Sequence, residues 1–148
     1  MARRPRSPAH EAWEVVADLW FGDETHDRFH NACAATDISP PQLKTLLSLH
    51  LGDDQPMRAI ADMLHCDASW VTGIVDGLEE RGYVERKPHP RDRRVKVVTI
   101  TALGEKAKAK AREQLYDPPA AFVNALTENE QRTLRDLLRK VRVSKSSE

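Results

Sequence analysis

Residues 67–100 read DASWVTGIVDGLEERGYVERKPHPRDRRVKVVTI, and their periodicity changes from helical to extended halfway along. In the first half, apolar side chains spaced three and four apart predict a helix over 68–81 with one buried face, made of Val71, Ile74, Val75 and Leu78. Asp67 is a favourable N-cap residue for that helix. Gly82 follows it directly, where a left-handed C-cap is expected.

The second half of this segment predicts a β-hairpin with a basic tip. Residues 83–87 alternate in polarity, residues 88–92 form a proline-containing turn, and residues 95–100 are rich in β-branched side chains. Between Arg81 and Lys96 the sequence holds seven basic and two acidic residues, a local net charge of +5 in a chain whose net charge is zero. A basic projection on a neutral chain can bind a polyanion.

A second, shorter helix is predicted just upstream, over 56–64. Only a few residues separate it from the helix over 68–81, which is the spacing of a helix-turn-helix. Ala61 is small enough to let the two helices approach, and Val71, ten positions later, is expected to pack back on the first helix. The turn between them favours glycine in a left-handed conformation. His65 stands there and is expected to adopt that conformation at some energetic cost.

In a helix-turn-helix, the outward face of the second helix meets the DNA major groove. Here that face is predicted to consist of Ser69, Trp70, Thr72, Gly73 and Asp76. Serine and threonine can bond base edges or phosphates, and glycine permits a close approach of the backbone. No arginine lies on this face, so specificity is expected to depend on the hairpin, on DNA shape or on apolar contact with thymine methyl groups. Trp70 either contacts DNA or packs on a neighbouring helix.

The hairpin tip carries the arginines that suit a minor groove, where the electrostatic potential is negative. These are Arg91, Arg93 and Arg94, with Asp92 between them. We expect Asp92 to hold a neighbouring guanidinium group in a fixed orientation. The alternative is a charged turn that only contacts solvent. The helix-turn-helix directly upstream favours the DNA-binding interpretation.

Longer helices flank this central region. They are predicted over 9–35, 40–51, 102–116 and from 127 to about 143, with a short further segment that ends at 125. Gly22 allows a bend in the first of them. Ser39 with Gln42 forms a capping box at the start of the second, and Thr127 with Glu130 forms one at the start of the last.

This order of elements predicts a mainly α-helical fold with a small β-hairpin wing, a winged helix-turn-helix. We expect one domain over 9–148, with a DNA-binding lobe at 39–101, dimerisation helices at 9–38 and 102–143, and a disordered basic tail at 1–8. The terminal helices carry apolar side chains that one copy cannot bury, among them Trp13, Trp20 and Phe122. A second copy is the simplest partner, so we predict a homodimer.

The composition is typical of one globular domain: 148 residues, 40% hydrophobic and 31% charged. The sequence has no apolar run of about 18 residues and no apolar stretch after its N-terminal arginines. We therefore expect no membrane span, no signal peptide and a cytoplasmic location. Cys33 and Cys66 are too few for a disulfide framework and are expected to be reduced thiols.

The motifs in this order resemble those of the MarR family of bacterial regulators. The family pattern is a Val-Thr helix ending in Leu-Glu-x-x-Gly, a wing with Asp-x-Arg, and then Leu-Thr-x-x-Gly. It is matched here by the segments 71–86, 90–94 and 100–104. Asp92 and Arg94 correspond to the wing pair, and Ile100 replaces the leucine. Gly73 and Gly77 differ from positions that often carry basic or polar residues in the family.

The resemblance implies a dimer, built by the N- and C-terminal helices, that binds pseudo-palindromic double-stranded DNA. Most members of the family are repressors. Many release DNA when a small, often aromatic, anion binds between the dimer helices and the DNA-binding lobe. Other members sense oxidants through a cysteine, or metals through histidine and carboxylate side chains.

Two sets of residues are candidates for sensing a signal. Trp13, Trp20 and His50 can line an effector pocket, although they suit the core and the dimer contacts equally well. His26, His30 and Cys33 share a helix face and are zinc-ligand types, but such a face is more often a polar surface, and we predict no metal and no cofactor. Both cysteines are expected to be inert, although oxidation of Cys66 in the turn would disturb DNA binding.

Two other classes of function compete with a DNA-binding regulator. A winged-helix module that binds only proteins has no need for three arginines on the wing tip. An enzyme is disfavoured because the sequence contains no Gly-rich phosphate loop, no nucleophile elbow and no HExxH helix. The sequence does not identify an effector or an operator.

Overall fold

The structure is a computed structural model that describes residues 7–143. For residues 142 and 143 it describes the backbone alone. Most of the predicted basic tail, and the predicted fraying end at 144–148, lie outside the described residues. Ser7 caps the first helix, so helical structure begins at Pro8, inside the range predicted as a tail. The described residues fall into two compact units, one ending at Tyr116 and the other beginning at Asp117.

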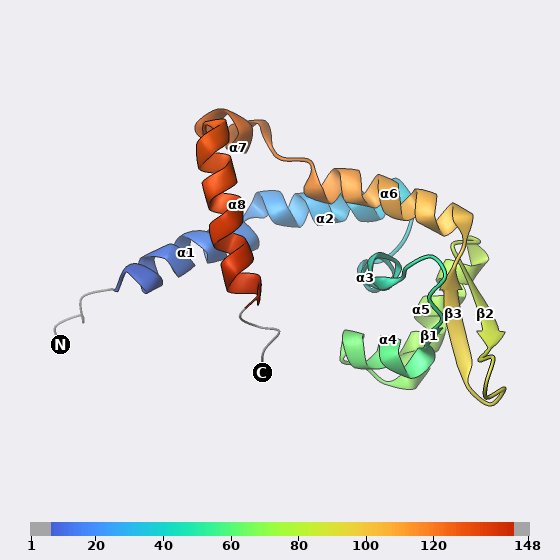
Figure 1. Cartoon of the computed structure of the whole chain (residues 1–148). Helices are drawn as coiled ribbons and strands as arrows, with labels where there is room; N and C mark the ends of the chain where they lie inside the picture. The colour runs from blue at the N-terminus through green and yellow to red at the C-terminus, as the bar shows by residue number, and fades with distance from the viewer. Residues whose placement is uncertain (1–6, 144–148) are drawn as a thin grey trace, which may run out of the picture. The chain divides into compact units, whose positions relative to one another are not determined.

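The centre of the first unit is a winged helix-turn-helix, as predicted (Figure 1). Its elements are α3 (Pro40–Ser48), β1 (Gln55–Pro56), α4 (Met57–Leu64), α5 (Ala68–Glu80), β2 (Val84–Pro88) and β3 (Lys96–Ile100). The three strands form an antiparallel sheet in the order β1-β3-β2, in which Val84 pairs with Ile100 and Gln55 pairs with Val98. The sequence predicted the hairpin but not β1, because two residues carry no detectable periodicity.

Three helices complete the first unit: α1 (Pro8–Phe21), α2 (Asp23–Thr36) and α6 (Ala102–Tyr116). Figure 1 shows α2 and α6 lying side by side along much of their length. The sequence predicted α1 and α2 as one helix with a bend. They are separate because Gly22 is extended, with φ −68° and ψ 157°, and ends one helix while capping the next.

The second unit contains α7 (Ala120–Ala125) and α8 (Glu128–Val143). The predicted capping box at the start of α8 is present, with the backbone N–H of Thr127 donating to Glu130 Oε2 at 2.8 Å. Within residues 128–141, no apolar side chain of α8 is buried, and Leu137 and Leu138 are about half exposed. Packing within the second unit therefore leaves the apolar stripe of this helix uncovered.

The core of the first unit lies where α3, α4 and α5 meet the sheet. Leu43, Leu46 and Leu78 are fully buried there. Ala61 and Val71 are buried as well, at 7% and 0% exposed, which confirms the predicted close packing of the helix-turn-helix pair.

The third helix is shorter than predicted. It ends at Ser48, because Leu49 is extended, with ψ 147°, and turns its side chain into the core. The carbonyl oxygen of Leu49 accepts a hydrogen bond from the buried ammonium group of Lys108 on α6. His50 falls within the helix predicted over 40–51. It lies beyond the helix end and is exposed.

The Thr-x-x-Gly motif that begins α6 has a steric explanation. Thr101 Oγ1 donates to the carbonyl oxygen of Gly82 at 2.6 Å and accepts from the N–H of Gly104 at 3.0 Å. A Cβ atom at Gly104 would overlap the carbonyl oxygen of Tyr83. Only glycine lets α6 approach the start of β2 this closely. Within residues 7–143, no helix has the length and apolar character needed to cross a bilayer.

Candidate nucleic-acid interface

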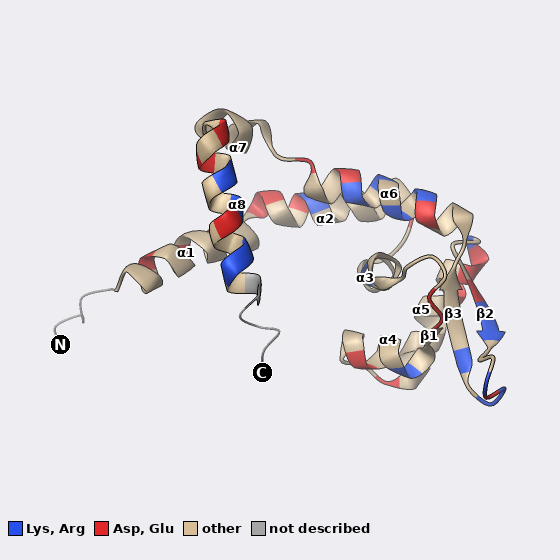
Figure 2. Cartoon of the chain, viewed as in Figure 1, with Lys and Arg blue, Asp and Glu red and all other residues tan. Residues whose placement is uncertain are grey.

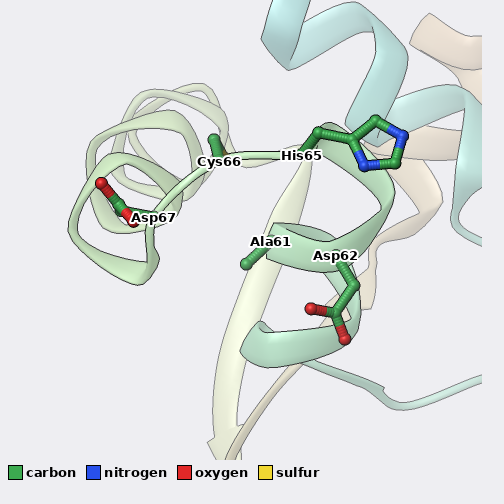
Figure 3. A pocket seen from close by; sticks show the side chains of 5 residues that line it. All are labelled: Ala61, Asp62, His65, Cys66 and Asp67. Carbon is green, nitrogen blue, oxygen red and sulfur yellow. The ribbon is translucent and has the colours of Figure 1, made fainter.

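The turn between α4 and α5 has the backbone predicted for a helix-turn-helix. His65 adopts φ 52° and ψ 45°, the left-handed conformation expected of it. A shallow cavity opens beside this turn (Figure 3). The side chains of Asp62, His65 and Asp67 point in different directions there, so they do not converge on a common ligand.

The outward face of α5 is open. Ser69, Thr72 and Gly73 are exposed, and a Cβ atom at Gly73 would have no neighbour within 4 Å. Thr72 Oγ1 donates to the carbonyl oxygen of Ala68 at 3.2 Å, which leaves the hydroxyl free to accept a further hydrogen bond. The helix contains no lysine or arginine. This surface can approach a duplex closely but cannot form the bidentate arginine–guanine contact.

Gly77 lies on a different side of α5. A Cβ atom there would overlap the side-chain amide of Gln42 on α3. The same amide reaches the carbonyl oxygen of Ile74 at 3.5 Å, and its oxygen accepts the N–H of Ser39 at 2.8 Å. The absence of a side chain at position 77 therefore serves the packing of α3 on α5.

Asp76 is on the exposed side of α5, as predicted, but it has a partner within the protein. Its carboxylate forms an ion pair with Arg86 on β2. Glu79 adds a second link, because its Oε1 accepts the backbone N–H of Arg86 at 3.0 Å and its Oε2 lies 3.3 Å from Arg86 Nε. Together the two carboxylates tie the wing to α5. The sequence prediction missed the roles of Arg86 and Glu79. The available signal was that Asp76 and Glu79 lie one helical turn apart on α5, where both can reach a basic residue on the following strand.

The wing tip displays its arginines to solvent. Arg91, Arg93 and Arg94 are exposed, and none of their guanidinium groups forms an ion pair with another described residue. Figure 2 shows the basic residues gathered on the loop between β2 and β3. We expected Asp92 to orient a guanidinium group. Its Oδ1 instead accepts the backbone N–H of Arg94 at 3.0 Å, which shapes the loop itself.

The base of the wing is held by Asp54, a residue that the sequence prediction missed. Its Oδ1 lies 2.8 Å from Lys87 Nζ on β2 and accepts the hydroxyl of Thr99 on β3 at 2.8 Å. The hydrogen bond from Lys87, and then the one from Thr99, hold the pKa of Asp54 below its ordinary value. One carboxylate thereby links both strands of the hairpin to the chain just before β1.

The far end of α5 is tied to α2. Arg81 Nη2 lies 3.1 Å from Asp37 Oδ2, just after the end of α2, and Arg81 Nη1 donates to the carbonyl oxygen of Gly77 at 3.1 Å. The hydroxyl of Tyr83 donates to the carbonyl oxygen of Thr36 at 3.1 Å. These contacts fix the direction of α5 relative to the long helices of the same unit.

Trp70 lies on the flank of α5 and has two kinds of surroundings. It lines an apolar cavity of about 260 Å³ together with Phe29, Pro40, Pro41, Lys44 and Leu64. The side chain nevertheless remains 64% exposed. Trp70 thus forms one wall of this cavity and presents most of its indole to solvent.

The three residues predicted to line an effector pocket are not brought together. Trp13 and Trp20 lie on α1, which joins α2 at Gly22, and they are 65% and 71% exposed. His50 follows α3, and Figure 1 shows α3 in the winged lobe, apart from α1. Sequence reasoning missed the cavity beside Trp70, because its lining residues come from four separate helices.

The residues considered as metal ligands are only partly assembled. His26 and His30 are exposed, with their Nε2 atoms 3.1 Å apart. Cys33 is buried, and burial raises the pKa of its thiol. Within the described part of the chain, no three histidine, cysteine or acidic side chains are placed to hold a metal ion. The thiols of Cys33 and Cys66 are both free.

Comparison with known proteins places this arrangement in a family. The sequence profile of the MarR family matches residues 38–96. The chain is 29% identical over 90 residues to the transcriptional regulator BilQ of Clostridium symbiosum, covering 61% of this chain and 62% of BilQ. It is 28% identical over 129 residues to the multiple antibiotic resistance protein MarR of Salmonella typhimurium, covering 83% of this chain and 87% of that protein. The fold resembles that of the transcriptional regulator Tm0710 of Thermotoga maritima, with a TM-score of 0.71, 22% identity and 94% of each chain covered.

The match to some curated relatives is partial. The chain spans 62% of BilQ and about half of two Bacillus subtilis regulators, YfiV and MhqR. BilQ, YfiV and MhqR are each named as HTH-type transcriptional regulators, and the prediction of a regulator and not an enzyme agrees with these names. The profile covers the winged lobe, and the structural likeness extends to the helices on both sides. The winged lobe of the chain, at residues 38–96, therefore belongs to the MarR family of transcriptional regulators.

Proposed function

We propose that this protein is a sequence-specific regulator that binds double-stranded DNA as a homodimer. The observation that carries the proposal is that Arg91, Arg93 and Arg94 at the wing tip have no ion-pair partner among the described residues. The strand β2 of this hairpin is linked to α5 through Arg86. Figure 1 shows the hairpin tip at the end of the lobe that lies away from α6, where α4 and α5 also lie. Such an arrangement suits a helix in the major groove and a wing beside it.

The base contacts follow from the chemistry of α5. Its open face offers two hydroxyl groups, on Ser69 and Thr72, and a bare backbone at Gly73. Hydroxyl groups bond to several bases and discriminate less than a bidentate arginine does. We infer that a large part of the specificity comes from minor-groove width and DNA deformability, sensed by the wing arginines.

In the proposed homodimer, each copy contributes one α5 helix and one wing to the DNA-binding site. Two copies related by a two-fold axis present two α5 helices to successive major grooves, about 34 Å apart, so the operator is pseudo-palindromic. The proposal places the protein with the DNA in the cytoplasm.

Selection of bound fragments from the source genome tests the proposal. We expect enrichment of a small set of fragments that share an inverted repeat with half-sites about 10 base pairs apart. Recovery of fragments without a common sequence would contradict sequence-specific binding. An interaction module without DNA contact would retain no fragment at physiological salt.

The second part of the proposal is that the protein is a repressor and that a small effector relieves the repression. The cavity beside Trp70 supports an effector site. Aromatic walls from Phe29 and Trp70, with the ammonium group of Lys44 at the side, suit a small aromatic anion. A ligand there would touch α2, α3, α4 and α5 at once. It could therefore shift the recognition helix relative to the long helix α2.

Salicylate serves as a probe for this cavity. We expect it to quench the fluorescence of Trp70 and to weaken DNA binding, and Lys44→Ala should reduce both effects. Lys110→Ala, which alters an exposed lysine on α6, is the matched control. Comparison with Trp70→Phe assigns the fluorescence signal. An unchanged response in Lys44→Ala would remove this cavity from the proposal.

A further inference from the structure

We propose that His26 and His30 form a two-imidazole binding site for a divalent transition-metal cation such as Zn²⁺ or Ni²⁺. The two residues lie one turn apart on α2. Their Nε2 atoms are 3.1 Å apart, and the ring centroids are 4.3 Å apart at an interplanar angle of 61°. The contact is a hydrogen bond between the two imidazoles, and a metal ion bound by both nitrogens would take the place of its proton.

The separation of the two nitrogens already suits one shared ion. With metal–nitrogen bonds of about 2.05 Å, a nitrogen–nitrogen distance of 3.1 Å gives an angle of about 98° at the metal. This angle lies between those of octahedral and tetrahedral coordination. Imidazole nitrogen is a preferred ligand of Zn²⁺, Ni²⁺ and Cu²⁺. We infer that rotation of the two rings about their side-chain bonds lets one ion bind both nitrogens while the helix backbone stays in place, and that water completes the coordination.

The charges around the pair favour a cation. The helix α2 itself carries three acidic residues, Asp23, Glu24 and Asp27, and one basic residue, Arg28. Asp23 and Asp27 fall on the same face of α2 as the two histidines, as the helical spacing requires. The basic residue nearest in sequence, Arg28, pairs with Glu24 at 3.4 Å and donates to the carbonyl oxygen of Gln114 on α6. Its charge is therefore committed elsewhere.

The surroundings also define what the site is not. Cys33 lies one turn beyond His30, but its side chain is buried and belongs to the core of the unit. His65 and Cys66 are near each other in sequence, but Figure 3 shows their side chains on different sides of the turn. We therefore assign the site to the two imidazoles alone, on an exposed and rigid stretch of helix. It is a chelating pair and not a closed structural zinc site.

Calorimetric titration of the full, tag-free chain with Zn²⁺ tests the assignment. We expect one ion per chain, and a loss of affinity of about tenfold or more in His26→Gln and in His30→Gln, because each change removes the chelate. His50→Gln alters another exposed histidine and should bind as the wild type does. In NMR spectra of the wild type, the ring signals of His26 and His30 should shift first.

Three results would overturn the assignment. They are binding that His26→Gln leaves unchanged, binding that Cys66→Ser abolishes, and a stoichiometry of one ion per two chains. Circular dichroism confirms that each variant is folded. None of these measurements involves DNA, so their outcome is separate from that of the proposed regulatory function.

Discussion

The ion pair between Asp76 and Arg86 changes the role that the sequence suggested for Asp76. A lone carboxylate on a DNA-facing helix would repel phosphates. Paired with Arg86, it holds β2 and the wing against α5. We therefore treat Asp76 as a residue that positions the wing and not as one that contacts bases.

Asp76→Asn distinguishes these two roles. If Asp76 positions the wing, the substitution should weaken DNA binding and lower the free energy of unfolding by about 1 kcal/mol, because the pair is partly exposed to solvent. Fluorescence anisotropy with operator DNA and urea denaturation measure the two effects. Tighter DNA binding by Asp76→Asn would mean that phosphate repulsion dominates and that the positioning role is wrong.

Asp54 gives the wing a dependence on pH. Because the pKa of its carboxyl is lowered in the folded protein, its contribution to stability is present above the unfolded pKa, about 3.9, and is lost as the pH falls through the folded value. Asp54→Asn should therefore have a lower Tm than the wild type at pH 7, and the difference should shrink below about pH 4. A difference in Tm that stays constant from pH 7 to pH 3 would contradict this account.

Single residues were predicted well where the signal is local. The left-handed His65, the Ser39–Gln42 bond and the Thr127 capping box each depend on a few consecutive residues. The pairs Asp76–Arg86 and Arg81–Asp37 were not predicted, because they join residues of different elements. Such contacts follow from how the elements pack, which one sequence does not specify.

At the scale of elements, a glycine in a crowded position and a glycine in an open position test how closely α6 packs on the start of β2. A Cβ atom at Gly104 would overlap the carbonyl oxygen of Tyr83, whereas one at Gly73 would have no neighbour within 4 Å. Gly104→Ala should lower the free energy of unfolding by about 2 kcal/mol or more, because backbone cannot move aside cheaply. Gly73→Ala should raise it by up to about 1 kcal/mol, since alanine favours a helix. Denaturant unfolding of both variants is the measurement, and equal effects would contradict the packing described.

Elements with strong periodicity were predicted closely, and those without it were not. The bounds of α6 agree with the prediction at both ends, and α5 differs by one residue. The strand β1 was missed, and α3 is three residues shorter than predicted. Tertiary contacts decide both features, because β1 exists only by pairing with β3, and Leu49 leaves the helix to enter the core.

At the scale of the whole molecule, the exposed apolar side chains of the terminal helices call for a partner. On α1, Leu19, Trp20 and Phe21 are between 67% and 82% exposed. This helix is acidic and has no basic residue, whereas α8 holds five basic and three acidic residues. Exposed apolar side chains on two helices of opposite net charge suit contact between copies of the chain.

Two leucines of matched exposure test where the copies meet. Leu19 on α1 is 67% exposed, and Leu51 in the winged lobe is 70% exposed. We expect two chains per particle in sedimentation at micromolar concentration, for the wild type and for Leu51→Glu. Leu19→Glu should dissociate the particle into monomers. A monomeric wild type, or a dimer that both variants leave intact, would contradict an interface at α1.

The central claim is that the guanidinium groups of the wing bind double-stranded DNA, and the salt dependence of binding tests it most directly. Each phosphate contact contributes about 0.9 to the slope of log affinity against log salt concentration. We predict that Arg91→Ala lowers the magnitude of that slope by about one unit, with the fold unchanged. Identical slopes for the wild type and Arg91→Ala would contradict the claim.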